Sequence, residues 1–247
     1  KNPGNWANSM KICFIDNAAD QTLGITTDSP VTAGMVVGHG VTSALTNVTI
    51  PGAGSTSTFT GFLKGIITGV STDAVGKASS IDVKIVSRVS SAGTETKIDY
   101  AEGDPLKSFE ASDTLFFVNN SGINTGGGGA TGRSEPVATQ VDWYDQQTLG
   151  LSNATVFWKS IAPKPTTSNF VQQRSGKNDA LHIAVVDDTG SITGIQGNIL
   201  EKFTNLSKAK DAIADGETGK KIFYKDFLAK NSTQIYAGSN PSAAGDA

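Results

Sequence analysis

Apolar and polar residues alternate along several segments between residues 34 and 119, and this pattern predicts short β-strands. The clearest case is the run IDVKI at 81–85, in which every second side chain is apolar, as in a strand with one buried face. Glycine and serine separate the segments, which favours a small barrel or sandwich. The predicted strands cover residues 34–41, 47–50, 59–70, 81–89, 95–100 and 114–119.

The stretch at residues 181–206 predicts the centre of a second part of the fold. Its first segment, 181–186, is rich in apolar and β-branched residues, and the turn sequence DDTG follows at 187–190. Residues 191–195 have the pattern of a short strand, so we expect a β-hairpin here. Apolar residues at 199, 200, 203 and 206 fit one face of a helix, and a twisted strand is the alternative.

Other segments extend this second part on both sides of residues 34–119. Met10–Asp16 is mostly apolar and predicts a strand. Further strands are expected at 140–144, 155–161 and 231–236, and short helices at 207–214 and 224–230.

The predicted fold class is α+β and β-dominated: a mixed α/β core domain with an inserted small β-barrel or sandwich subdomain. The core domain is expected to be discontinuous, covering residues 1–30 and 136–247. The inserted β subdomain covers residues 31–120. Residues 121–135, which contain four consecutive glycines, form a glycine-rich linker.

Composition excludes several classes of protein. The chain has 247 residues, enough to bury a sizeable core in one or two domains. Its net charge is −3, without the basic surplus typical of proteins that bind nucleic acid or anionic membranes. No apolar run approaches the ~20 residues that span a membrane, and no signal peptide is expected. The single cysteine, Cys13, is expected to be a buried thiol in the first strand.

Residue types that commonly bind metals do not cluster in the sequence. His39 and His182 are far apart and have no Cys or His neighbour at ligand spacing, so no zinc site is expected. Asp187 and Asp188 are adjacent, and they fit a hairpin turn better than a Mg²⁺ or Ca²⁺ site.

Two glycine-containing stretches were considered as phosphate-binding loops, and neither fits. The glycines at 126–129 are not followed by Gly-Lys-Ser or Gly-Lys-Thr. The run GETGKK at 216–221 also fails the pattern of a phosphate-binding loop. That pattern needs Gly at position 214, which is Ala214, and Ser or Thr at position 221, which is Lys221. No nucleophile elbow or Cys-His arrangement is present either. We therefore expect no enzyme activity and no cofactor.

The aromatic residues Trp143, Tyr144, Phe157 and Trp158 flank residues 145–153. Core packing is the default explanation for such residues. Contact between subunits is the alternative, because large aromatic side chains are favoured at the centre of interfaces.

Several segments together are similar to the tail sheath proteins of contractile-tailed phages. The similarity lies first in the strand that ends in DDTG and in the run EKFTNLS at 201–207. Further similar runs are NPGNWAN at 2–8, VDWYDQQTLGL at 141–151 and WKSIAPKP at 158–165, which resemble sheaths of myoviruses, including cyanophages. The similarity covers residues 1–16 and 136–237, and extends only loosely over 31–130.

This resemblance implies a mechanical function. Sheath subunits polymerise around an inner tail tube and contract to drive the tube through the host envelope during genome delivery. It implies a virion protein that is assembled in the host cytoplasm. Its partners would be other copies of itself, the tail tube protein, and baseplate and tail terminator proteins. In such sheaths, chain termini add strands to a neighbour's sheet. The chain is expected to be a middle fragment that lacks both termini.

Two other hypotheses remain from the residues alone. A β-rich receptor- or carbohydrate-binding module would use the aromatic residues to stack on sugars. An enzyme would need convergent carboxylates, such as Asp142 or Asp145 with Asp187 or Asp188, and no spacing supports that. The candidate subunit-contact residues are Trp143, Tyr144, Trp158, Glu201 and Phe203.

Overall fold

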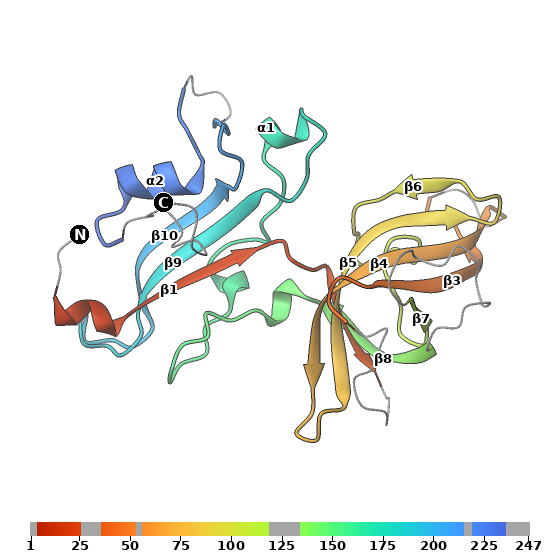
Figure 1. Ribbon diagram of the computed structural model, residues 1–247, viewed down its shortest axis with the longest axis horizontal. Coiled ribbons are helices and arrows are strands. Elements are labelled where there is room, and N and C mark those ends of the chain that lie inside the picture. Colours follow the sequence, from red (N-terminus) through yellow and green to blue (C-terminus); the bar gives the residue numbers. More distant parts are fainter. Residues whose placement is uncertain (1–3, 26–35, 53–55, 119–133, 215–218, 236–247) are drawn as a thin grey trace, which may run out of the picture. The chain divides into compact units, whose positions relative to one another are not determined.

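The computed structural model describes residues 4–25, 36–52, 56–118, 134–214 and 219–235. Of these residues, 45% are in strands and 12% in helices, so the chain is β-dominated. It divides into two compact units (Figure 1). The continuous segment Ala18–Gln146 is here called the barrel unit. The other, the sheet unit, combines Lys1–Asn17 with Gln147–Ala247.

The barrel unit holds one antiparallel sheet that closes on itself. Neighbouring strands follow the order β2-β8-β7-β3-β4-β5-β6, and β2 also pairs with β5, so six strands form a closed barrel. Closure removes the free edges of those six strands. The strands are β2 (Gln21–Ile25), β3 (Gly40–Thr49), β4 (Thr58–Thr72), β5 (Ala78–Ser90), β6 (Glu95–Lys97), β7 (Thr114–Val118) and β8 (Ser134–Asp142).

Alternate side chains of these strands fill the barrel. In β5, Ile81, Val83 and Ile85 are buried while the residues between them are partly exposed, as the sequence pattern predicted. The connection between β6 and β7 adds Leu106 and Phe109, which are fully enclosed in the same core. The predicted small barrel or sandwich is therefore a barrel.

Glycine allows close packing inside this barrel. A Cβ atom on Gly65 of β4 would lie 2.5 Å from Cγ1 of Val83 and 3.1 Å from Cε2 of Phe109. Neither distance leaves room for a methyl group without displacement of a buried side chain. Gly65 is thus a packing requirement of the fold, as glycine within a strand often is.

The sheet unit holds a three-stranded antiparallel sheet in the order β1-β9-β10. The described part of this unit also has short helical segments. The strands are β1 (Met10–Asp16), β9 (Ala180–Asp187) and β10 (Asn198–Ser207), and the helices are η1 (Asn5–Ser9), η3 (Trp158–Ser160), α1 (Asn169–Gln172) and α2 (Tyr224–Asn231). A further short helix, η2 (Tyr144–Gln146), belongs to the barrel unit.

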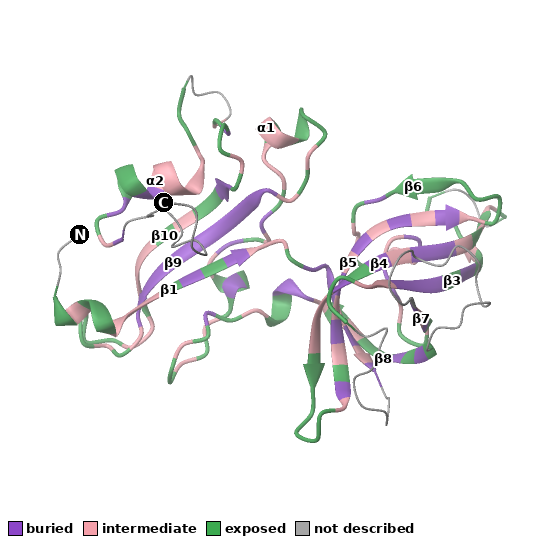
Figure 2. Cartoon of the chain, viewed as in Figure 1, coloured by how far each residue is buried: buried purple, intermediate pink, exposed green. Residues whose placement is uncertain are grey.

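The central strand β9 is buried along its whole length, whereas β1 alternates between buried and exposed residues (Figure 2). On one face of β9, Leu181, Ile183 and Val185 join a hydrophobic cluster with Leu228 of α2. β9 therefore serves as the core strand that its continuous apolar sequence predicted.

The structure corrects several local predictions. Residues 191–195 form turns rather than a strand, and the hairpin partner of β9 is β10, across a ten-residue loop. The segment 199–206 is a strand, which was the alternative to a helix, and it bulges between Phe203 and Leu206. Residues 155–161 are mostly a 3-10 turn, and 207–214 are not helical. The helix at 224–230 is confirmed as α2.

Two remaining predictions fall partly outside the described residues. The last predicted strand, 231–236, is not a strand over residues 231–235, and residue 236 lies outside the described ranges. Of the predicted linker, residues 121–133 also lie outside them, while 134–135 begin β8.

The boundaries between the units lie at 17/18 and 146/147, instead of near residues 30 and 136. The reason is the pairing of β2 and β8, which the sequence analysis had assigned to the core domain. β2 pairs with β5, and β8 pairs with β7, so both complete the barrel. The sequence predicted no strand over residues 21–25 and only residues 140–142 of β8, so it gave no sign of this pairing.

Candidate functional site

Three of the aromatic residues that were candidates for subunit contacts pack inside the chain. Trp143, Tyr144 and Trp158 are all buried, which agrees with core packing. Burial also raises the pKa of Tyr144 to about 12. Phe157, at 39% exposed, is the one member of this group that reaches the surface. Three of these four aromatic side chains are therefore not open to solvent for stacking on a sugar ring.

The other two candidates, Glu201 and Phe203 of β10, also have partners within the chain. The Glu201 carboxylate accepts hydrogen bonds from Oγ of Ser232 (2.5 Å) and from N and Oγ1 of Thr233 (2.7 Å each). Burial acts to raise the pKa of Glu201, but these bonds hold it below its ordinary value. Phe203 packs edge-to-face on Phe227 of α2, with ring centroids 6.0 Å apart. Both residues hold the region around α2 on β10.

The two histidines lie in the described part of the chain, and the contacts of His182 are structural. In the described ranges, no group of three or more His, Cys, Asp or Glu side chains is placed to hold a metal ion. His182 is fully buried, where Nε2 lies 2.7 Å from the carbonyl oxygen of Pro163 and Nδ1 accepts a hydrogen bond from the backbone N–H of Asn205. These two contacts fit the tautomer that carries its proton on Nε2. His182 thus fixes the bulge in β10.

Asp187 and Asp188 stabilise loops, as the turn prediction implied. The Asp187 carboxylate accepts hydrogen bonds from N of Gly190 (2.9 Å), N of Ile192 (2.9 Å), and N and Oγ1 of Thr193 (2.7 and 3.0 Å). Burial acts to raise the pKa of Asp187, but these bonds hold it below its ordinary value. Asp188 accepts bonds from Oγ (2.7 Å) and N (2.8 Å) of Ser152, which lower its pKa.

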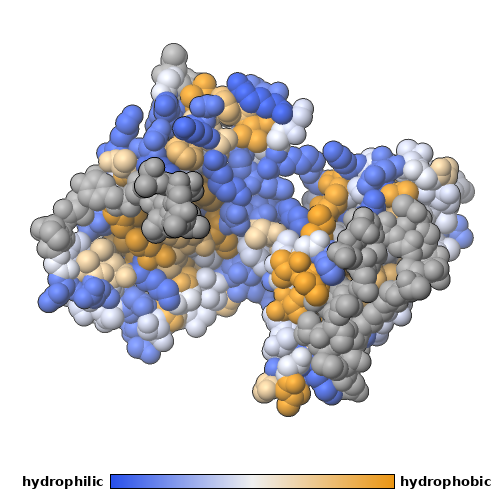
Figure 3. Space-filling view, viewed as in Figure 1, coloured by the Kyte–Doolittle hydropathy of each residue, from blue (hydrophilic) through white to orange (hydrophobic). Residues whose placement is uncertain are grey.

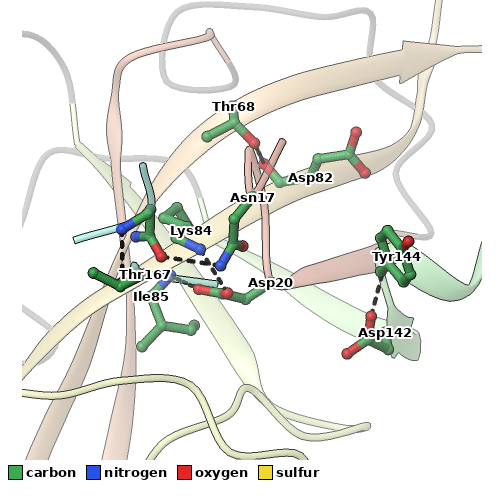
Figure 4. Close-up of polar contacts among 10 residues, drawn as sticks. Asn17, Asp20, Thr68, Asp82, Lys84, Ile85, Asp142, Tyr144 and Thr167 are labelled. Atoms are coloured by element: carbon green, nitrogen blue, oxygen red, sulfur yellow. Dashed lines mark hydrogen bonds and ion pairs between the residues drawn. The ribbon is translucent and has the colours of Figure 1, made fainter. Parts of the chain in front are cut away.

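In the barrel unit, a partly buried ion pair lies where the chain enters β2. The Asp20 carboxylate accepts hydrogen bonds from Nζ of Lys84 (2.8 Å) and from the backbone N–H of Ile85 (2.9 Å), as Figure 4 shows. Nearby, burial and then the charge of Asp142 raise the pKa of Tyr100. These contacts join β2 to β5 and give the acidic groups structural partners.

An open cleft of about 320 Å³ in the sheet unit offers little chemistry. None of its lining residues is acidic, basic, a histidine or a cysteine, so the cleft contains no candidate acid or base. The lining residues are Thr166, Thr167, Ser168, Asn169, Ala180, Asn205, Ile213, Ala214 and Ile222.

An exposed apolar surface lies on β1. Phe14 is 57% exposed and Ile12 is 44% exposed, and both belong to the same face of the strand because they are two residues apart. They lie opposite Ile183 and Val185 of β9. Together Ile12 and Phe14 are here called the β1 strip. Figure 3 shows hydrophobic surface on the sheet unit in the area where β1 and β9 run in Figure 1.

The opposite face of β1 is covered by the chain itself. Cys13 is buried there, and its Sγ donates to the carbonyl oxygen of Leu149 at 3.2 Å. Burial raises the pKa of the Cys13 thiol above its ordinary value of 9.0, and the burial confirms the predicted buried thiol. Nζ of Lys11 also donates to the carbonyl oxygen of Gly150. β1 therefore has one covered face and one apolar face that is open.

Among the described strands, only β9 pairs with β1, so β1 is an edge strand. Proteins usually protect such edges with charges, proline or a covering segment. The sequence predicted β1 but not its exposed strip, because an apolar strand has the same sequence pattern at the edge of a sheet as at its centre. No sequence signal separates the two cases.

None of the described helices is long and apolar enough to cross a membrane. Comparisons with protein-family models, with curated proteins and with solved structures found no match to this chain. A functional proposal then has to rest on the structure and the sequence, and the β1 strip is the surface that we use for it.

Proposed function

We propose that this chain is a structural subunit of a contractile phage tail sheath, which polymerises around the inner tail tube and shortens to drive the tube through the host envelope. The observation that supports self-assembly is the β1 strip on an open edge strand. The kind of assembly comes from the sequence resemblance at residues 2–8, 141–151, 158–165 and 181–207. In this proposal the sheet unit belongs to the mixed α/β core domain of the sheath, in the virion.

The physical reason is the cost of leaving this strip in water. Burying a Phe or Ile side chain completely contributes about 1.5–3 kcal/mol, and the two side chains of the strip are roughly half exposed. Covering them would thus contribute about 1–1.5 kcal/mol each. An added strand would also pair the free backbone groups along the open edge of β1. A surface of this kind favours contact with another protein chain.

Sedimentation velocity over a range of protein concentrations tests this proposal. The wild-type chain is expected to form large species as its concentration rises. Phe14→Glu places a charge on the strip, so we expect it to raise the concentration needed for assembly by tenfold or more. Val75→Glu is the matched control, because Val75 is 76% exposed in the barrel unit and lies outside the strip.

Far-ultraviolet circular dichroism must show that both variants keep the wild-type fold. A wild-type chain that stays monomeric at all accessible concentrations would contradict self-assembly through the β1 strip. An equal effect of the two variants would remove the β1 strip as its basis.

A further inference from the structure

The segment at residues 224–235 covers part of one face of the three-stranded sheet and is here called the strap. It consists of α2 and the four residues that follow it. Leu228 and Ile235 of the strap are buried in the same cluster as Ile183 and Val185 of β9. The strap therefore lies on the face of the sheet to which these two β9 side chains belong.

The β1 strip belongs to the same face of the sheet. Phe14 pairs with Ile183 and Ile12 with Val185, and side chains directly opposite in antiparallel strands lie on one face. Ile183 and Val185 are fully buried, whereas Phe14 and Ile12 are largely exposed. The strap thus covers the β9 side of this face and leaves the β1 side open.

Glu201 of β10 gives the strap a directional attachment. It lies opposite Val185, so its side chain belongs to the covered face. Its carboxylate accepts the hydrogen bonds from Ser232 and Thr233, which come directly after α2 in the strap. Hydrogen bonds to a charged acceptor are stronger than those between neutral groups. Apolar contacts have no such direction, so Glu201 fixes where the strap is held.

The strap has little stability of its own. α2 has eight residues, and its N-cap, Phe223, has no side chain that could accept a hydrogen bond from the helix. Isolated helices shorter than about 12–15 residues are marginal in water. β9, in contrast, pairs with a strand on each side and is buried along its whole length. Segments with such unequal support open separately, at different free energies.

We propose that the strap is a conformational device that opens as one unit while the three-stranded sheet stays folded, and that Glu201 sets how often it opens. Opening uncovers Ile183 and Val185 beside the β1 strip, and so extends the exposed apolar surface across the sheet. Glu201 is a positioning residue in this device. The inference does not depend on the proposed function, because it rests on contacts within one copy of the chain.

Hydrogen–deuterium exchange followed by mass spectrometry tests the device on the full chain. Glu201→Gln keeps the size of the side chain and removes its charge. We expect amide exchange in the strap to become at least about tenfold faster, because hydrogen bonds to a charged acceptor are lost. Exchange in β9 should stay within about twofold of the wild type, because β9 keeps both of its strand partners.

Asp211→Asn is the matched control, because it removes a charge from an exposed carboxylate outside the strap and should leave strap exchange unchanged. Wild-type exchange in the strap of Glu201→Gln would overturn the role of Glu201. Equal acceleration in the strap and in β9 would overturn the strap as a separate unit.

The wild-type chain supplies a second test that needs no variant. Its protection factors should be at least about tenfold lower in the strap than in β9. Equal protection in the two segments would contradict the device.

Discussion

At the scale of single residues, Asp187 shows how one side chain can determine a loop. The sequence DDTG predicted a turn after β9, and the structure has one there. The sequence did not indicate that the loop continues to residue 197, because the hydrogen bonds from Ile192 and Thr193 to Asp187 have no sequence motif. A short polar side chain that accepts several backbone hydrogen bonds is recognisable only in three dimensions.

Asp187→Asn is expected to lower the melting temperature at neutral pH by roughly 5 °C, because an amide replaces a carboxylate that accepts four hydrogen bonds. The pKa of Asp187 is held below its ordinary value of 3.8, so its ionised form contributes stability above that pH. This contribution is lost as the pH falls through the lower, folded pKa.

The variant should therefore lose less stability than the wild type on acidification from about pH 5 to pH 2.5. Thermal unfolding followed by circular dichroism measures both effects, with the exposed Asp211→Asn as the control. Equal pH dependence in wild type and Asp187→Asn would contradict this role of Asp187.

At the scale of secondary structure elements, some strands were predicted closely, while others were missed or wrongly predicted. Met10–Asp16 is a strand with the predicted bounds, and the alternation at 81–85 gave both β5 and its buried face. The segment 199–206 was ambiguous, because its apolar spacing fits both a helix and a bulged strand. A bulge shifts the two-residue period, and only the pairing with β9 resolves it.

The two faces of β1 should respond differently to substitution. Ile15 is buried and Phe14 is largely exposed, although the two are adjacent. We expect Ile15→Ala to cost about 2–4 kcal/mol of the free energy of unfolding, and Phe14→Ser less than about 1 kcal/mol. Urea unfolding of dilute protein measures both values. A Phe14→Ser cost as large as that of Ile15→Ala would mean that the strip is covered.

Gly65→Ala is expected to destabilise the barrel unit by about 1–3 kcal/mol, because its methyl group would overlap Val83 and approach Phe109. Alanine has the higher strand propensity, so backbone preference alone predicts the opposite sign. Urea unfolding is again the measurement, with Thr72→Ala at an exposed position of β4 as the control. A neutral or stabilising effect would show that the barrel has room at this position.

At the scale of the whole molecule, the sequence predicted a β-dominated chain, and the structure is β-dominated. The sequence also predicted one part inserted into another, and the structure divides into a continuous barrel unit between the two segments of the sheet unit. The sequence placed the boundaries wrongly because strand pairing between β2 and β8 joins segments distant in sequence. Three of the five candidate contact residues, the aromatic residues Trp143, Tyr144 and Trp158, are buried. The exposed large apolar residues include Ile12 and Phe14 instead.

The proposed function requires that copies of this chain assemble into a sheath. Negative-stain electron microscopy of the wild-type chain at high concentration tests it most directly. The proposed function predicts stacked rings or hollow tubes with a regular repeat, which Phe14→Glu removes and Val75→Glu retains. Dispersed single particles in the wild-type sample, under conditions that favour assembly, would contradict the claim.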